Sequence, residues 1–202
     1  YNTKIDLTQF LYYILTKKSI NINAIFCPGY TENGYKDYVG RNNTLRLETL
    51  KFLSRELKQM NIPTDFKIML ANIFLENVDE TLNSNWKEEL DIHANKYFES
   101  DQITKLSDIY PEEKYIKGFI NEDICKGKVY NNFYKNNLDF YHKMGWNNNQ
   151  IKCRNDKLYT IYSILSEYIN NQENGVYIPM ETMYSRSKVM TNNGVCTMYL
   201  KK

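Results

Sequence analysis

Residues 20–27 read ININAIFC and are followed directly by Pro28 and Gly29. The run is short and apolar and stops at residues typical of turns, which predicts a buried β-strand. Strands that are apolar over most of their length are typical of parallel sheets with helices on both faces. The strand ends in a cysteine, and the loop that follows it, to about Asn43, contains several tyrosines, asparagines and glycines.

The segments after this loop extend the pattern to a β-α-β unit. A helix is expected over 44–61, because one side of it carries Leu47, Leu50, Leu53, Leu57 and Met60. Ile62-Pro63 ends this helix. Residues 65–71, DFKIMLA, predict a second buried strand. We therefore expect a Rossmann-like, three-layer α/β domain with a central, mostly parallel sheet.

The rest of the chain predicts a helical middle section and a short return to strands. Apolar groups at helical spacing indicate helices over 6–18, 85–99, 111–125, 129–144 and 156–169. Gly145 is expected to end the fourth of these, and Asp156 to cap the fifth. Late strands are expected over 175–184 and 194–200, with a basic loop at 185–188 that contacts solvent or phosphate.

Composition bounds the class of protein. The 202 residues are 42% hydrophobic and 25% charged with a formal net charge of +2, which fits one soluble domain, residues 1–202. We expect no membrane span and no signal peptide, and a cytoplasmic protein with reduced thiols. Two histidines and four scattered cysteines do not form a metal motif, and no phosphate-binding glycine motif occurs, so neither metal nor cofactor is expected.

Position in the fold makes the loop 27–38 the candidate site. In open α/β sheets ligands bind beyond the carboxyl ends of the strands, where Cys27 and its loop are expected. A thiol there is a nucleophile if a helix amino terminus or a cation lowers its pKa, or otherwise a small buried apolar group. Within the loop, Gly29, Tyr30 and Asn33 are the candidate substrate-binding residues.

Two further groups of polar residues lie on expected helices. Tyr159, Ser163 and Glu167 recur every fourth residue and share one side of the 156–169 helix, which predicts either a substrate-binding face or a solvated one. Tyr159 and Ser163 are therefore added to the candidate substrate-binding residues. His93 lies on an apolar helix face and is expected to be a hydrogen-bonded residue at the edge of the core.

The layout resembles the tRNA-dependent cyclodipeptide synthases, which are themselves similar to the catalytic domain of class I tyrosyl- and tryptophanyl-tRNA synthetases. The first likeness is the strand ending at Cys27, then Tyr30 and Tyr38, and Asn43-Thr44-Leu45 leading into a leucine-rich helix. The second lies near the end of the chain and consists of Tyr162, Glu167, Gly175-Val176, Tyr184 and 194–200.

The resemblance implies an aminoacyltransferase of secondary metabolism that uses aminoacyl-tRNA and works through a covalent aminoacyl-enzyme. Cys27, which stands in the place of the family's serine, would be the nucleophile. Tyr162 and Glu167 would anchor the amino group, and Tyr184 would relay protons. In the family the tyrosine and the glutamate lie one helical turn apart, whereas here they are five residues apart. Either Ser163 replaces the tyrosine, or the helix is misread, or this chemistry is absent.

Two alternatives stay open. Pro28, Val39-Gly40, Glu48-Thr49-Leu50 and 66–70 resemble a run in the isocyanide synthases, which act on an amino acid and a sugar phosphate. The other alternative is a non-catalytic Rossmann-like module that binds nucleotide or tRNA. Reactivity of the Cys27 thiol and co-purification with tRNA distinguish among these readings.

Overall fold

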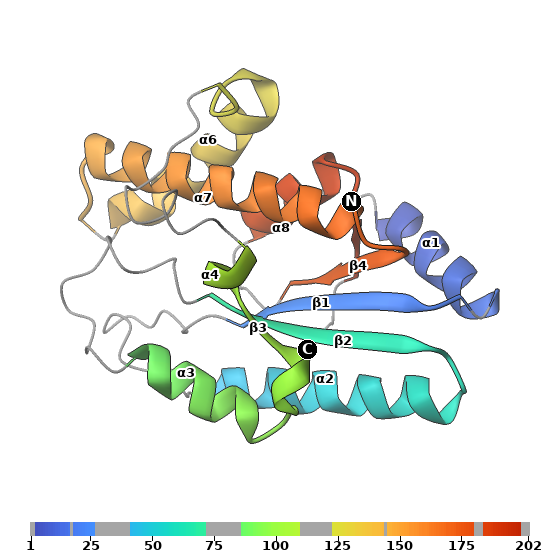
Figure 1. Ribbon diagram of the computed structural model, residues 1–202. Helices are drawn as coiled ribbons and strands as arrows, with labels where there is room; N and C mark the ends of the chain where they lie inside the picture. Colours follow the sequence, from blue (N-terminus) through green and yellow to red (C-terminus); the bar gives the residue numbers. More distant parts are fainter. Residues whose placement is uncertain are drawn as a thin grey trace.

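The structure is a computed structural model that describes residues 3–16, 18–26, 41–71, 86–109, 123–143, 145–179 and 184–198. Within these residues five strands form one parallel sheet in the order β3-β2-β1-β4-β5 (Figure 1). The strands are β1 (Ile20–Phe26), β2 (Thr64–Leu70), β3 (Ile103–Lys105), β4 (Gly175–Ile178) and β5 (Cys196–Thr197). The Rossmann-like α/β fold expected from the sequence is confirmed, with a sheet that is parallel throughout its described strands.

β1 is the central strand and has a parallel neighbour on each side. Ala24 pairs with Ile68 of β2 and with Ile178 of β4. Six of the seven residues of β1 are buried, because helices cover both faces of the sheet. One of the six is polar: Asn23 donates from its side chain to the Gln172 Oε1 atom at 2.7 Å, so its burial is compensated.

Helices form the two outer layers (Figure 1). α2 (Arg41–Gln59) and α3 (Trp86–Asn95) cover one face, and α7 (Asn148–Asn170) and α8 (Tyr184–Asn192) cover the other. α6 (Gly127–Lys143) packs against α7 and α8, while α1 (Thr3–Leu15) packs against β5. The short η1 (Ser100–Gln102) and α4 (Leu106–Ile109) flank β3. The helical middle section expected from the sequence thus adds α6 outside the second layer.

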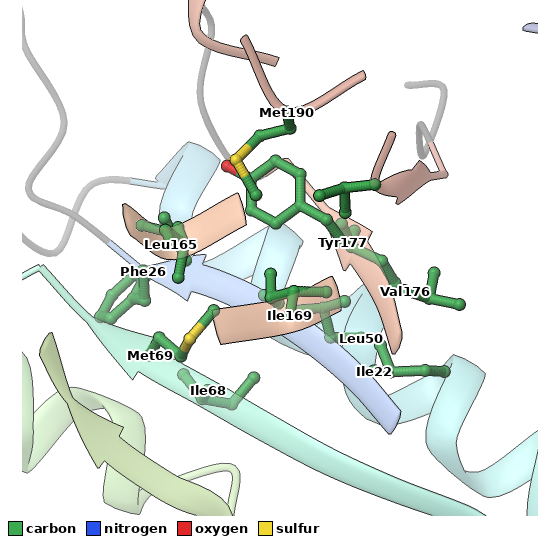
Figure 2. Close-up of a cluster of buried hydrophobic side chains, with 14 of the residues drawn as sticks. Ile22, Phe26, Leu50, Ile68, Met69, Leu165, Ile169, Val176, Tyr177 and Met190 are labelled. Atoms are coloured by element: carbon green, nitrogen blue, oxygen red, sulfur yellow. The ribbon is translucent and has the colours of Figure 1, made fainter. Parts of the chain in front are cut away.

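The core fills the space between the sheet and these helices (Figure 2). It joins fully buried side chains of β1, β2 and β4 to those of α2, α7 and α8, among them Ile22, Leu50, Ile68, Leu165, Ile169, Val176 and Met190. Tyr177 and Phe26 belong to the same cluster and have no exposed surface. Burying a side chain of this size stabilises a fold by about 1.5–3 kcal/mol, so the cluster is the main source of stability.

The structure corrects several expected boundaries. α2 ends at Gln59, and the backbone of Asn61 turns into the left-handed region with φ 54°, so Met60 is 54% exposed instead of buried. α6 does end before Gly145, which has φ +79°. Except for 123–125, the helix expected over 111–125 lies outside the described residues.

α7 begins earlier than expected. Asn147, not Asp156, is its N-cap: the Asn147 side chain accepts from the Gln150 backbone, and the Gln150 side chain accepts from the Asn147 backbone. Asp156 lies inside the helix. Farther along, β4 stops at Ile178 instead of continuing to residue 184, and residues 185–188 belong to α8 instead of a basic loop.

Candidate functional site

The candidate site lies at the carboxyl edge of the sheet. The strand order changes direction between β1 and β4, and in open α/β sheets ligands bind beyond the carboxyl ends of the strands at such a point. β1 ends at Phe26 and β4 at Ile178, in neighbouring register. Cys27, Gly29, Tyr30 and Asn33 follow Phe26 in the chain and lie outside the described residues.

α7 extends past the strands at this edge. Its 23 residues span about 34 Å, while the seven residues of β1 span about 23 Å. Because α7 leads into β4 and all strands are parallel, its amino-terminal half lies at the carboxyl edge and continues beyond it (Figure 1). Side chains on this half of α7, and those of α6 packed on it, are therefore available to a site that the second half cannot reach.

Tyr162 and Tyr159 both face inward from α7. Tyr162 has no exposed surface, and Tyr159 is 6% exposed. The Tyr159 ring packs edge-on against Tyr130 with centroids 5.2 Å apart, and against Phe133 at 5.5 Å. Burial, and after it the proximity of Cys125, raises the pKa of Tyr159. The expectation that Tyr159 lies on the polar side of α7 is wrong, because α6 covers that side.

Ser163 and Glu167 lie apart from these tyrosines in their exposure. Ser163 is half-buried and Glu167 is exposed. Five residues separate Glu167 from Tyr162, which turns the two side chains about 140° from each other around α7. The structure therefore does not bring Tyr162 and Glu167 together. Tyr184 is the first residue of α8, and its side chain is not among those described.

A buried acidic group on α7 escaped the sequence analysis. The Asp156 carboxylate accepts a hydrogen bond from the Tyr130 hydroxyl of α6 and another from the Lys152 ammonium one helical turn earlier. Asp156 is 4% exposed, whereas the Lys152 side chain is 62% exposed. Burial, reinforced by the bond to Asp156, raises the pKa of Tyr130. Its sequence signal is the spacing of Asp156 and Tyr159, which lie three residues apart.

Two more polar pairs continue this contact along the two helices. The Asn137 side chain donates to Asn155 at 2.7 Å, and the Arg154 Nε atom donates to the Tyr141 hydroxyl at 2.8 Å. The Arg154 guanidinium also lies 5.5 Å from the ring centroids of both Tyr141 and Trp146. We call these three pairs, Tyr130–Asp156, Asn137–Asn155 and Tyr141–Arg154, the polar seam. It fixes the register of α6 on α7.

Cys125 is a thiol next to the first pair of the polar seam. Its Sγ atom lies 3.5 Å from the backbone oxygen of Asp156 and 3.7 Å from the Thr160 hydroxyl. An oxygen-rich surrounding of this kind lacks the cation that would lower a thiol pKa. The described contacts of Cys125 are therefore those of a packed thiol that donates to a carbonyl.

His93, on the opposite layer, lies closest to the end of β1. Its ring stacks on that of Phe26 with centroids 5.8 Å apart and meets Tyr97 edge-on at 5.6 Å. It is 4% exposed, as expected for an edge-of-core residue. The expectation of a hydrogen-bonded ring is wrong for the described residues, among which neither ring nitrogen has a partner. Burial, and after it the charge of Lys96, lowers the pKa of His93.

Comparison of the chain with protein-family models, with curated proteins and with solved structures finds no match. Among the residues described, no helix combines the length and the apolar character that a membrane crossing requires. Nor, in that part of the chain, do three His, Cys, Asp or Glu side chains gather as a group able to hold a metal ion. The chemistry of the site must therefore be argued from its own side chains.

Proposed function

We propose that the protein is an aminoacyltransferase that takes an aminoacyl group from aminoacyl-tRNA onto Cys27 and converts it to a cyclic dipeptide or a related amino-acid product. The observation that carries the proposal is the strand order, with its change of direction next to the strand that Cys27 follows. Amino acid and tRNA are thus the proposed ligands of the carboxyl edge.

Strand alternation supports a thiol on the α7 side. Along β1, Phe26 stacks on His93 of α3, whereas Asn23 reaches Gln172 just beyond α7. Odd-numbered residues of β1 therefore point toward the α7 layer. Pro28 favours an extended backbone at the residue before it, which would keep Cys27 in the same alternation. Tyr162 is buried in that layer.

The proposed steps balance as follows. The Cys27 thiol loses its proton and attacks the ester carbonyl, so that a C–S bond forms and the C–O bond to the tRNA ribose breaks; the ribose oxygen leaves with a proton. The amine of the bound aminoacyl group then attacks the ester of a second aminoacyl-tRNA, which forms a C–N bond and breaks a C–O bond. Finally the free amine attacks the thioester, releasing the ring and the thiol.

A mass-spectrometric search for the covalent intermediate tests this proposal. Purified protein is incubated with charged tRNA, digested and searched for an aminoacyl mass on the peptide that contains Cys27. Neutral hydroxylamine should remove the adduct from Cys27 but leave the ester formed by a Cys27→Ser variant. Cys153, which is exposed on α7, is the internal control. Absence of an adduct, or equal labelling of Cys153, would contradict the proposal.

A second candidate is a non-catalytic tRNA-binding module, and the exposure of Glu167 favours it. In the enzyme reading Glu167 anchors the amino group, but its side chain points away from that of Tyr162. A Glu167→Gln variant decides the matter once an adduct is found, because only an anchoring role makes adduct formation depend on it. Binding of uncharged tRNA, with no adduct in wild type or variants, would leave the module.

A further inference from the structure

The imidazole of His93 is buried without compensation by the described residues. A neutral imidazole carries one N–H donor and one bare nitrogen acceptor. Both atoms are inaccessible, and neither has a hydrogen-bond partner in the described part of the chain. Buried polar groups are nearly always hydrogen-bonded, and an exception has a cause such as a catalytic role, a water or an ion. His93 therefore needs a partner beyond the described contacts.

The surroundings of His93 exclude a structural ion pair as the cause. The ring lies between the aromatic rings of Phe26 and Tyr97, at 5.8 and 5.6 Å. The nearest charge that acts on it is that of Lys96, which disfavours a second positive charge. An imidazole in this setting is uncharged at neutral pH, and it offers hydrogen bonds to an uncharged group.

The location of His93 connects it to the candidate site. Phe26, on which it stacks, is the last residue of the central strand. The ring thus lies under the carboxyl end of β1, where ligands of open α/β sheets bind. It lies on the α3 side of the sheet, opposite the layer of Tyr162. A ligand that crosses this edge can meet α7 at one end and His93 at the other.

We propose that His93 binds a hydroxyl group of the ligand that occupies the carboxyl edge. A hydroxyl matches the ring because it donates to the bare nitrogen or accepts from the N–H. Resting on the proposed function, the hydroxyl is the free one of the terminal ribose, which neighbours the ester that Cys27 attacks. His93 is then a specificity residue for a ribose-bearing ligand, while the nucleophile acts from the other layer.

Stability gives a test that needs no ligand. A residue kept for binding and left unsatisfied lowers stability, so its replacement by an apolar ring of similar shape raises it. We expect His93→Phe to raise the midpoint of thermal unfolding by about 2–4 °C. His142, which is exposed and bonded to Asn148 at 2.8 Å, is the matched control, and His142→Gln should leave the midpoint unchanged. A lower midpoint for His93→Phe would mean that the ring is already satisfied and would overturn the proposal.

The second arm measures binding with an adenosine whose 3′ carbon carries an amino acid through a stable amide. In ring-labelled protein the ligand should shift the signals of His93 and leave those of His142 in place. His93→Phe should bind about tenfold more weakly, and His93→Gln, which keeps a donor and an acceptor, should bind more tightly than His93→Phe. The 2′-deoxy ligand should lose the same factor with wild type. Equal affinity of both ligands would overturn the proposal, while an absent Cys27 adduct would overturn only the transfer chemistry.

Discussion

Tyr130 of α6 and Asp156 of α7 share a hydrogen bond in which the phenol donates to a carboxylate that is almost completely buried. The pair belongs to a contact that includes Lys152 and the neighbouring ring of Tyr159. Since α7 also packs on the sheet, this bond links the outer helix α6 to the layer that borders the candidate site. Its loss affects both stability and the position of the tyrosines on α7.

Removing the phenol hydroxyl tests this link. Tyr130→Phe leaves the buried carboxylate of Asp156 with one donor fewer, which should lower the free energy of unfolding by about 1.5–3 kcal/mol. Urea denaturation measures it. Asp123→Asn is the matched control, because the Lys126–Asp123 ion pair is 68% and 91% exposed and should contribute no more than about 0.5 kcal/mol. Similar values for both variants would mean that the phenol–carboxylate bond contributes little.

His93 makes stability depend on acid pH. Its pKa in the folded protein is lowered below its ordinary value of about 6.5 by burial and by Lys96. Below pH 6.5 the unfolded chain binds a proton that the folded ring resists, so stability is complete above that pH and falls below it. The slope from this residue is at most about 1.4 kcal/mol per pH unit. Unfolding of wild type and His93→Phe at pH 7.5 and 5.5 measures it, and equal losses in both proteins would refute the assignment.

The buried tyrosines act at the alkaline end. The pKa of Tyr130 and that of Tyr159 are raised in the folded protein, in both cases chiefly by burial. Above pH 10 the unfolded chain releases protons that the folded protein keeps, so stability is present below pH 10 and falls above it. Tyr130→Phe and Tyr159→Phe should each flatten this fall between pH 9 and 11. Tyr12→Phe, at a half-exposed position of α1, should follow the wild-type curve.

Gly175 allows α7 and β4 to approach closely. A Cβ atom there would lie 2.3 Å from the backbone oxygen of Ile169, which cannot move without shifting the end of α7. We expect Gly175→Ala to cost about 1–3 kcal/mol or more. At Gly145 a Cβ meets nothing within 4 Å, but φ is +79°, so Gly145→Ala should cost about 1–2 kcal/mol.

Asparagine separates these two causes in thermal unfolding. It adopts the left-handed backbone more readily than alanine, so it should be better tolerated than alanine at position 145. At position 175 it should be worse than alanine, because the clash grows with size. The same order at both positions would contradict the steric assignment of Gly175.

Ile169 tests the contribution of the core. It has no exposed surface and lies in the cluster between α7 and the sheet (Figure 2). Ile169→Ala should lower the free energy of unfolding by about 2–5 kcal/mol through lost burial and the remaining cavity. Leu15→Ala, at a side chain that is 81% exposed on α1, should change it by less than about 0.5 kcal/mol. A small effect at Ile169 would mean that the cluster repacks.

The main elements were predictable where one hydrophobic pattern dominated. β1, β2 and α2 have apolar patterns that only one period explains, and the parallel sheet follows from their order. β3 was missed because three residues are too few to establish a period. Residues 185–188 were misread as a loop because Pro179 and the strand end before it were not recognised as the break between β4 and α8.

The candidate site was less predictable, since α7 is buried on two sides. One side packs on the sheet through Leu165 and Ile169, and the other packs on α6 through Tyr159 and Asp156. A reading that seeks one apolar stripe assigns the second side to solvent, and this explains the errors at Tyr159 and Asp156. His93 was placed correctly near the core, but no sequence pattern reports whether a buried ring has hydrogen-bond partners.

The sheet is bordered by β3, with three residues, and β5, with two. A long unpaired border strand exposes a row of amide and carbonyl groups on which a strand from another molecule can assemble. Borders this short in the described chain present only a few such groups. Fibril-like stacking of folded molecules through the sheet therefore has little template to start from, even though the interior strands are as apolar as those of aggregating peptides.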